Sequence, residues 1–238
     1  MTDIANTGER ILLEKETPLM IARHFSAYRF ACGYLSGRKT LEVGCGEGYG
    51  SRYLADFVSD LTAVDYDAAV IEYARCRYQK ENLHFLVANA KELEKIKDTF
   101  SAACSFQFIE HLSDAESFLH DVCNLLDGTG VFICSTPNRK DASPGSQSPF
   151  NRFHQREYLF EEFRGLLERH FKEVAMFGLK RSRKLDFFRR LKKSGICNFL
   201  PDSVNPVRRF YRNIDCTDFA IVQNNLDTAL DFIAVCRK

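Results

Sequence analysis

Four glycines recur at every second position of one short stretch: Gly44, Gly46, Gly48 and Gly50. Residues 40–43 before them are typical of a short buried strand, and a helical pattern begins at Ser51. Residues without a Cβ let a backbone turn approach a ligand closely, and the N–H groups at the start of the next helix face that ligand. We therefore predict that this strand, turn and helix bind a nucleotide-like molecule.

The spacing of the glycines separates two kinds of nucleotide-like ligand. A dinucleotide site requires G-x-G-x-x-G or A, with an acidic residue roughly 20 positions further on. Tyr49 occupies the third small position and does not fit, whereas Asp65, 21 positions after Gly44 and at the end of the apolar run 61–64, does fit. An NAD(P) oxidoreductase is therefore the weaker of two enzyme hypotheses.

The stretch matches E/D-x-G-x-G-x-G from Glu42 to Gly48, and in this it resembles the class I S-adenosylmethionine (AdoMet) dependent methyltransferases. The resemblance covers residues 39–178. It implies that the backbone of Gly44, Cys45, Gly46 and Gly48 passes under the amino-acid and ribose parts of AdoMet. Glu42 would hold the ammonium group of the ligand, directly or through water.

Further cofactor contacts are implied at the ends of the next two expected strands. Asp65 would accept hydrogen bonds from both ribose hydroxyls, each contributing about 1.5–3 kcal/mol. Tyr66 would lie against the adenine, and Asn89 and Ala90 match the position that reads the adenine amino group. Taken singly, Glu42 could be a strand-edge charge, Tyr66 a packing residue and Asn89 a turn former, but their joint order favours a cofactor site.

The fourth expected strand leads into the next motif of the family, residues 105–112. Phe106 and Gln107 would lie beside the methionine part of AdoMet. Methyl transfer is an in-line displacement, so holding the two reactants in line supplies roughly 7–11 kcal/mol. A general base adds about 10²- to 10⁴-fold for a hydroxyl acceptor. Because histidine titrates near neutral pH, His111 and His154 are candidates for that base, with structural roles as the alternative.

The same motif allows a metal-dependent alternative. Glu-x-x-Glu-His followed by a distant His is similar to a divalent-metal site of ubiquinone-pathway O-methyltransferases and small-RNA terminal 2′-O-methyltransferases. Here Gln107 replaces the first Glu, which leaves Glu110, His111 and His154. Loss of an anionic ligand weakens a divalent site. We therefore predict no metal and keep these three residues as catalytic candidates.

The elements that position these residues alternate between strand and helix. Strand patterns at 61–64, 83–87, 100–106 and 131–135 are separated by helical ones, and further strand patterns follow at 174–177 and 230–235. Asp67 is expected to cap one helix, and a capping box at 113–116 is expected to start another, which Asp127-Gly128 closes. The resemblance implies a Rossmann-like class I methyltransferase fold, an α/β fold with a seven-stranded, mostly parallel sheet and helices on both faces.

The segments on either side of this core are read as substrate-side. Thr17-Pro18 is typical of a helix start, and that helix is expected to reach Leu35 and end at Gly37. In the family such a segment covers the cofactor or forms part of the acceptor pocket. The long connection 137–153 follows a central strand, where open α/β sheets bind ligands. We expect one domain over 1–238, divided into a helical segment 1–37, an AdoMet-binding core 38–136 and a substrate-side part 137–238.

Residues 180–193 carry eight Lys or Arg interleaved with apolar side chains, and Arg208, Arg209 and Arg212 add more. A solvated basic helix face is one explanation. The functional one is contact with an anionic surface, such as a phosphorylated or lipid-linked acceptor, a membrane or RNA. The interleaved aromatics favour a membrane surface over a nucleic-acid duplex, so we expect no nucleic-acid partner.

Composition sets the broad class of the protein. The 238 residues suffice for one α/β domain that buries roughly 70% of the surface of the unfolded chain. Lys and Arg number 33 against 32 Asp and Glu, so no global charge draws the chain to nucleic acid or membrane. Nine scattered cysteines include Cys104, Cys134 and Cys236 in apolar runs, which indicates reduced core thiols. Without a long apolar run, and with the polar start Met1-Thr2-Asp3, we expect a cytoplasmic protein.

A wider set of motifs resembles bacterial methyltransferases associated with surface-polysaccharide biosynthesis. The set comprises Gly8-Glu9-Arg10, residues 44–50, Glu110-His111, residues 135–139 and residues 153–157. It implies a saccharide or another small hydroxyl acceptor, methylated at oxygen. A methyltransferase acting on RNA or another macromolecule, and a non-catalytic AdoMet-binding protein, are the alternatives.

Overall fold

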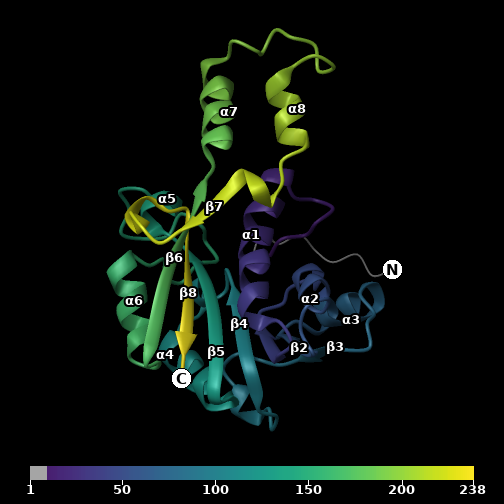
Figure 1. The fold of residues 1–238 in the computed structure, drawn as a ribbon, viewed down its shortest axis with the longest axis vertical. Helices are drawn as coiled ribbons and strands as arrows, with labels where there is room; N and C mark the ends of the chain where they lie inside the picture. The colour runs from purple at the N-terminus through teal and green to yellow at the C-terminus, as the bar shows by residue number, and fades with distance from the viewer. Residues whose placement is uncertain (1–9) are drawn as a thin grey trace.

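An eight-stranded sheet forms the centre of the molecule in the computed structural model, which describes residues 10–238 (Figure 1). Its strands follow the order β3-β2-β1-β4-β5-β8-β6-β7. The bounds are β1 (Lys39–Val43), β2 (Asp60–Asp65), β3 (Leu83–Val87), β4 (Phe100–Phe106), β5 (Leu126–Pro137), β6 (Glu173–Arg181), β7 (Phe219–Val222) and β8 (Asp231–Arg237). Neighbouring strands from β1 to β5 are parallel, β8 is antiparallel to β5 and β6, and β7 is antiparallel to β6.

This order places a ligand site at one edge of the sheet. β1 pairs with β2 on one side and with β4 on the other, so the order of the strands reverses between β1 and β4. At such a reversal the loops after neighbouring strands turn to opposite faces and leave a crevice at the carboxyl ends. The glycine turn follows β1, and the predicted cofactor and catalytic residues follow β2, β3 and β4 at that same edge.

Helices cover both faces because alternate residues of each strand point to opposite sides. In β5, Val131 and Ile133 belong to one buried cluster, and Phe132 and Cys134 belong to the other. The first cluster includes side chains of α1, α2 and α3, and the second includes those of α4 and α6. The helices are α1 (Pro18–Leu35), α2 (Tyr49–Leu54), α3 (Ala68–Arg77), α4 (Ala115–Leu125), α5 (Arg139–Ala142), α6 (Phe160–Glu168), α7 (Arg183–Ser194) and α8 (Pro206–Arg212).

Two predicted helix starts are confirmed and one is wrong. The Thr17 hydroxyl accepts a hydrogen bond from the Met20 N–H at the start of α1, and the Asp67 carboxylate accepts from Ala69 and Val70 at the start of α3. The expected box at 113–116 does not form, because Asp114 caps α4 through the Ser117 N–H. Asp127-Gly128 does not end α4 as expected, because α4 ends at Leu125 and these two residues already belong to β5.

The sheet has one strand more than the seven expected. The additional strand is β7, which pairs with the outer edge of β6 from Gly178↔Val222 to Arg181↔Phe219. Its four residues, Phe219–Val222, are too few for an alternating pattern to be recognised in the sequence. By covering β6 it removes a row of unpaired backbone groups from one edge of the sheet.

Between β6 and β7, helices α7 and α8 form a hairpin that stands away from the sheet (Figure 1). Its two helices pack through Phe188 and Phe210, whose rings are stacked with centroids 4.1 Å apart. Leu185 and Val207 are buried beside them. The basic segment predicted at 180–193 therefore forms one leg of a structured projection.

Cys104, Cys134 and Cys236 are buried in the core, as expected for small apolar side chains. Within residues 10–238, no helix is both long and apolar enough to cross a membrane. The expectations that fall on Met1-Thr2-Asp3, on Gly8-Glu9 and on the first part of the 1–37 segment lie outside the described residues.

Candidate functional site

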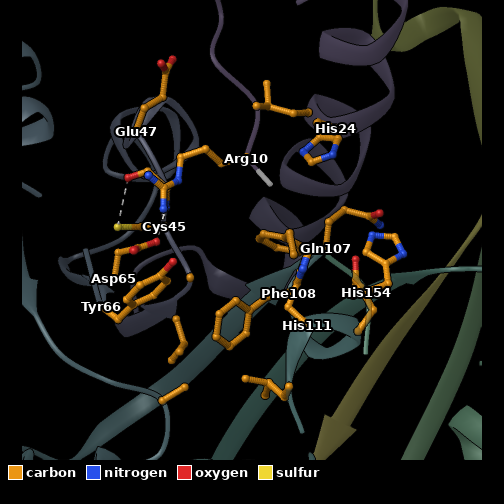
Figure 2. Close-up of a pocket in the computed structure, with 18 of the residues that line it drawn as sticks. Arg10, His24, Cys45, Glu47, Asp65, Tyr66, Gln107, Phe108, His111 and His154 are labelled. Carbon is orange, nitrogen blue, oxygen red and sulfur yellow. Dashed lines mark hydrogen bonds between the residues drawn. The ribbon is translucent and has the colours of Figure 1, made fainter. Parts of the chain in front are cut away.

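A cavity of about 520 Å³ opens at the carboxyl edge of β1, β2, β4 and β5, and side chains of α1 line one side of it (Figure 2). Twelve of the predicted site residues line this cavity: Gly44, Cys45, Gly46, Asp65, Tyr66, Asn89, Ala90, Phe106, Gln107, Glu110, His111 and His154. The other two predicted site residues, Glu42 and Gly48, do not line it. The cofactor and catalytic candidates therefore share one space.

The glycine turn holds the floor of the cavity close to β2. The Gly44 and Cys45 N–H groups donate to the Val64 carbonyl at 2.9 and 3.0 Å. Gly44 has φ +79°, and a Cβ there would lie 2.3 Å from the Phe108 ring, so only glycine fits. Gly48 instead begins α2, away from the cavity.

Asp65 fixes the turn to the end of β2. Its carboxylate accepts from the Gly46 N–H and from the Asp67 N–H, both at 3.1 Å. Burial raises the pKa of this carboxyl, while the two backbone donors and the nearby Arg10 guanidinium partly offset that effect. Tyr66 follows with a half-exposed ring on the cavity side (Figure 2). The position suits a carboxylate that accepts from hydroxyl groups of a ligand.

Glu42 lies one layer behind the cavity wall. Its side chain is buried and accepts a 2.8 Å hydrogen bond from the Tyr28 hydroxyl, and Tyr28 itself lines the cavity. Burial raises the pKa of Glu42 to about 7. The Tyr28 ring can reach this position because Gly50 has no Cβ. A Cβ there would lie only 2.0 Å from the ring. The other carboxylate oxygen of Glu42, Oε2, has no hydrogen-bond partner among residues 10–238.

At the end of β4 the backbone takes an uncommon conformation. Gln107 has φ +50°, and its N–H donates to the Ser135 carbonyl at 3.0 Å. A non-glycine residue in the left-handed region is strained, and such positions concentrate at functional sites. The strain lets the chain leave β4 so that Phe106 contacts Tyr28 while Glu110 and His111 follow in a short 3-10 turn.

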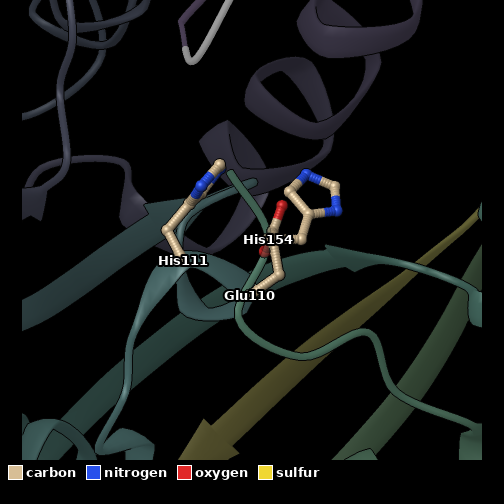
Figure 3. Close-up of side chains that lie close together, drawn as sticks. All are labelled: Glu110, His111 and His154. Carbon is tan, nitrogen blue, oxygen red and sulfur yellow. The ribbon is translucent and has the colours of Figure 1, made fainter. Parts of the chain in front are cut away.

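Glu110, His111 and His154 bring one carboxyl group and two imidazoles together in the cavity (Figure 3). One potential ligand atom from each side chain lies within 4.8 Å of the other two. The His111 Nδ1 donates to the Phe153 carbonyl at 3.0 Å, which leaves the lone pair on Nε2. The His154 Nδ1 lies 2.7 Å from Glu157 Oε1, and its Nε2 lies 3.0 Å from the Asn151 amide.

The burial of the carboxylates matters for this group. Glu157 is 2% exposed, so it holds the His154 ring from inside the protein. Glu110 is 1% exposed, and its Oε2 accepts from the Thr136 hydroxyl at 3.0 Å. Burial raises the pKa of Glu110 to about 8, and its Oε1 has no hydrogen-bond partner among residues 10–238. Two imidazoles and one carboxylate are donors that a divalent cation accepts, although the donor expected at Gln107 is an amide.

One side of α1 faces the cavity, and this was not predicted in detail. Met20, Arg23, His24 and Tyr28 line the cavity at helical spacing. Arg23 forms two hydrogen bonds with Asp231 of β8, at 2.8 and 2.6 Å. His24 is 3.1 Å from the Tyr49 hydroxyl, and burial lowers its pKa to about 4, so it is neutral at pH 7. In the sequence, this face is indicated by polar residues spaced three and four positions apart along an otherwise apolar helix.

Residues 41–134 match the family described as a methyltransferase domain. A relative from Mycobacterium tuberculosis, named a probable S-adenosylmethionine-dependent methyltransferase, is 37% identical over 175 residues. That match covers 73% of this chain but only 63% of the relative. A ubiquinone biosynthesis O-methyltransferase of Azorhizobium caulinodans is 27% identical over 122 residues, which cover 50% of this chain and 48% of that relative.

A solved structure extends the likeness to the whole fold. It is an S-adenosylmethionine-dependent methyltransferase of Thermotoga maritima, described as a possible histamine N-methyltransferase. The TM-score is 0.67 over 97% of both chains at 17% identity, so this likeness shows the fold alone. The likeness to the solved structure confirms the predicted fold class. The family match and the named relative favour a methyltransferase over the oxidoreductase hypothesis.

Proposed function

We propose that this chain, which carries a class I S-adenosylmethionine-dependent methyltransferase domain, transfers the methyl group to an oxygen of a small hydroxyl acceptor, with His154 as general base. The observation that carries the proposal is the contact between His154, which lines the same cavity as the glycine turn and Asp65, and the buried Glu157 behind it. Such a pair gives a base that is held in position and can carry a positive charge.

The cofactor half of the cavity supplies binding. Bound AdoMet supplies a methyl group on a positively charged sulfur, which is a good leaving group. In the proposal Asp65 accepts the ribose hydroxyls, the backbone of residues 44–46 lies under the ligand, and Asn89 and Ala90 lie at the adenine. Glu42 acts on the ligand through the Tyr28 hydroxyl, since it lies behind that ring.

The other half supplies proton transfer. The His154 Nε2 accepts the proton of the acceptor hydroxyl. Throughout this step the His154 Nδ1–H donates to the Glu157 carboxylate, whose negative charge stabilises the resulting imidazolium. The Asn151 amide, now 3.0 Å from the His154 Nε2, yields its place to the acceptor. His111 lies at a right angle to His154, with ring centroids 4.9 Å apart, and completes the wall around the acceptor oxygen.

A saccharide or other small hydroxyl compound is the proposed acceptor. The relative named an O-methyltransferase supports oxygen as the methylated atom. The motif set at 135–139 and 153–157 supports a link to surface-polysaccharide chemistry. We place the reaction in the cytoplasm, where thiols such as the buried Cys104 and Cys134 stay reduced.

The test measures cofactor binding and turnover separately. Purified protein is supplied with AdoMet and a panel of sugar, phenol and carboxylate acceptors, and release of S-adenosylhomocysteine is followed. We expect turnover with a hydroxyl compound, and a loss of about 10²- to 10⁴-fold in kcat for His154→Asn with unchanged affinity for S-adenosylhomocysteine. Equal turnover of His154→Asn and wild type would contradict the proposed base, and no turnover with any hydroxyl acceptor would contradict the acceptor class.

A metal-assisted form of the same reaction is the second candidate. The buried Glu110 Oε1, beside the nitrogens of His111 and His154, is the observation that favours it. Those three residues would hold a divalent cation, which would lower the pKa of an acceptor hydroxyl. Turnover that survives dialysis against a chelator would remove this candidate, and a loss restored by one divalent cation would favour it over the general base.

A further inference from the structure

The hairpin of α7 and α8 carries a charge unlike that of the rest of the chain. Residues 180–212 contain 11 of the 33 Lys and Arg but only 2 of the 32 Asp and Glu. The remaining residues therefore have a negative balance, although the whole chain is close to neutral. A local charge of this size attracts anionic surfaces at distances up to the screening length of the solution.

Most of these cations face solvent. Among the described residues, Lys184 pairs with Asp218, Arg208 with Asp202, and Arg181 with Asp141. Arg189, Arg190 and Lys193, on the last two turns of α7, are exposed and form no ion pair with residues 10–238. The positive charge of the hairpin is therefore left for a partner outside the described chain.

An apolar surface lies at the end of the hairpin, in the loop 195–205. Ile196, Phe199 and Val204, which we call the apolar tip, are 61%, 78% and 64% exposed. Phe187 on α7 is similarly exposed. Large apolar side chains that cluster at this exposure mark an interaction site, because water disfavours them there.

The loop that presents the apolar tip is structured. The Asn205 side chain is buried, donates to the Cys197 carbonyl at 2.6 Å and accepts from the first N–H groups of α8. Cys197 is buried, while Ile196 and Phe199 on either side of it are exposed. The apolar side chains are held outside a loop that already has its own small core.

We propose that the hairpin of α7 and α8 attaches the protein to the surface of a bilayer that contains anionic lipids, with the apolar tip inserted. The apolar side chains enter the boundary between headgroups and acyl chains, and the cations of α7 and α8 behind them contact the headgroups. An RNA duplex would satisfy the cations but offers no apolar phase for Ile196, Phe199 and Val204. This attachment does not depend on the proposed acceptor or on methyl transfer.

The direction of the hairpin gives this attachment a consequence. Strands β5 and β6 run the same way, since both are antiparallel to β8. The hairpin leaves the carboxyl end of β6, so it projects from the edge of the sheet at which the cavity opens (Figure 1). A protein held by the apolar tip would present that edge toward the lipid.

Flotation with vesicles tests the proposal. The full chain is mixed with phosphatidylcholine vesicles with and without phosphatidylglycerol. We expect flotation only with phosphatidylglycerol, weakened by added salt. The double variants Ile196→Ser/Phe199→Ser and Arg189→Glu/Arg190→Glu should each lower the apparent partition coefficient by about tenfold or more. Because all four side chains are exposed, thermal unfolding should stay within a few degrees of wild type.

Matched controls make the result specific. Phe150→Ser removes an equally exposed aromatic elsewhere, and Lys97→Glu/Lys172→Glu reverses two exposed cations outside the hairpin. Both should float like wild type. Undiminished flotation of the tip variant would overturn the proposal. Two other results would also overturn it. One is RNA binding that needs no vesicles and is lost in the charge-reversal variant, and the other is a dimeric wild type with a monomeric tip variant. Calorimetry with S-adenosylhomocysteine should give wild-type affinity for every variant, which separates this result from the proposed function.

Discussion

The two halves of the cavity are built in different ways. The cofactor half consists of turns after three strands that follow one another in sequence, and its polar contacts are backbone N–H groups and one carboxylate, Asp65. The histidine half combines α1, the turn after β4, the loop after β5 and Asp231 of β8. It holds the buried titratable groups His24, Glu110 and Glu157.

This difference predicts which residues can be substituted to alter the acceptor and which cannot be substituted without loss of the cofactor. In the proposed function, a backbone turn closed by Asp65 would bind the same cofactor whatever the acceptor, and the geometry of this turn comes from a short motif. The histidine half depends on side chains from distant segments, so substitutions there can alter the acceptor without disturbing the fold. Variants in the first half should therefore change affinity for the cofactor, and variants in the second should change turnover.

The largest effect is expected from Asp65→Ala. It removes two charge-assisted hydrogen bonds to the ligand and frees the Gly46 N–H, at a cost of roughly 3–6 kcal/mol. Titration calorimetry with S-adenosylhomocysteine should show a loss of affinity of at least about 10²-fold. Asp60→Ala, at the other end of β2, is the control and should bind like wild type. Similar affinity of the two variants would break the proposed assignment of the cofactor half.

A second prediction concerns pH and the buried carboxyls. The pKa of Glu110 rises from 4.5 in the unfolded chain to about 8 in the folded protein, so folding takes up a proton. The contribution of Glu110 to stability is then full below pH 4.5 and is lost as pH rises toward about 8, by an amount on the order of a few kcal/mol. Glu42 adds to this loss up to about pH 7.

Denaturant unfolding at several pH values checks this dependence. Glu110→Gln keeps the shape of the side chain without the charge, so it should flatten the decline between pH 5 and 8. The exposed Glu168→Gln should leave the decline unchanged. An unaltered slope in Glu110→Gln would show that this carboxyl does not carry the pH dependence of the histidine half.

The third prediction tests the contact between the two halves. A Cβ at position 50 would overlap the Tyr28 ring, so Gly50→Ala should displace Tyr28 and break its hydrogen bond to Glu42. We expect a loss of about 1–3 kcal/mol in the free energy of unfolding, measured by denaturant titration. Gly165→Ala in α6 meets no atom within 4 Å and should stabilise slightly, as alanine does in a helix. Equal stability of the two variants would contradict the packing role of Gly50.

The smallest effect is expected from Glu157→Gln. Glu157 is a positioning residue that acts through His154, so the variant should lower kcat by about 10- to 100-fold and leave the affinity for S-adenosylhomocysteine unchanged. Glu157→Asp should restore part of the rate. A parallel loss of cofactor affinity would show that the two halves are not separable.

The sequence predicts well those features whose information is local. The bounds of β3 and β4, the caps at Thr17 and Asp67, and the place in the cavity of twelve of the predicted site residues all follow from short patterns. Each depends on spacing within one strand, turn or helix start, and such spacing is visible in a single chain.

What the sequence does not predict depends on contacts between distant segments. Glu42 lies behind Tyr28 because α1 packs over the glycine turn, and no pattern near Glu42 indicates that helix. The pairing of β7 with β6 requires the chain to return after the hairpin. The role of Glu157 beside His154 becomes visible only once the loop after β5 is placed.

The ion pair between Arg23 and Asp231 joins residues 208 positions apart, and this has a consequence for synthesis. Asp231 belongs to β8, the strand that lies between β5 and β6. A ribosome adding roughly 5–20 residues per second needs on the order of 10–40 s to travel from one partner to the other. Until then α1 lacks its ion pair with β8, and β6 can pair only with β7. We therefore expect the side of the cavity that Arg23 lines to take its final form only after β8 has left the ribosome.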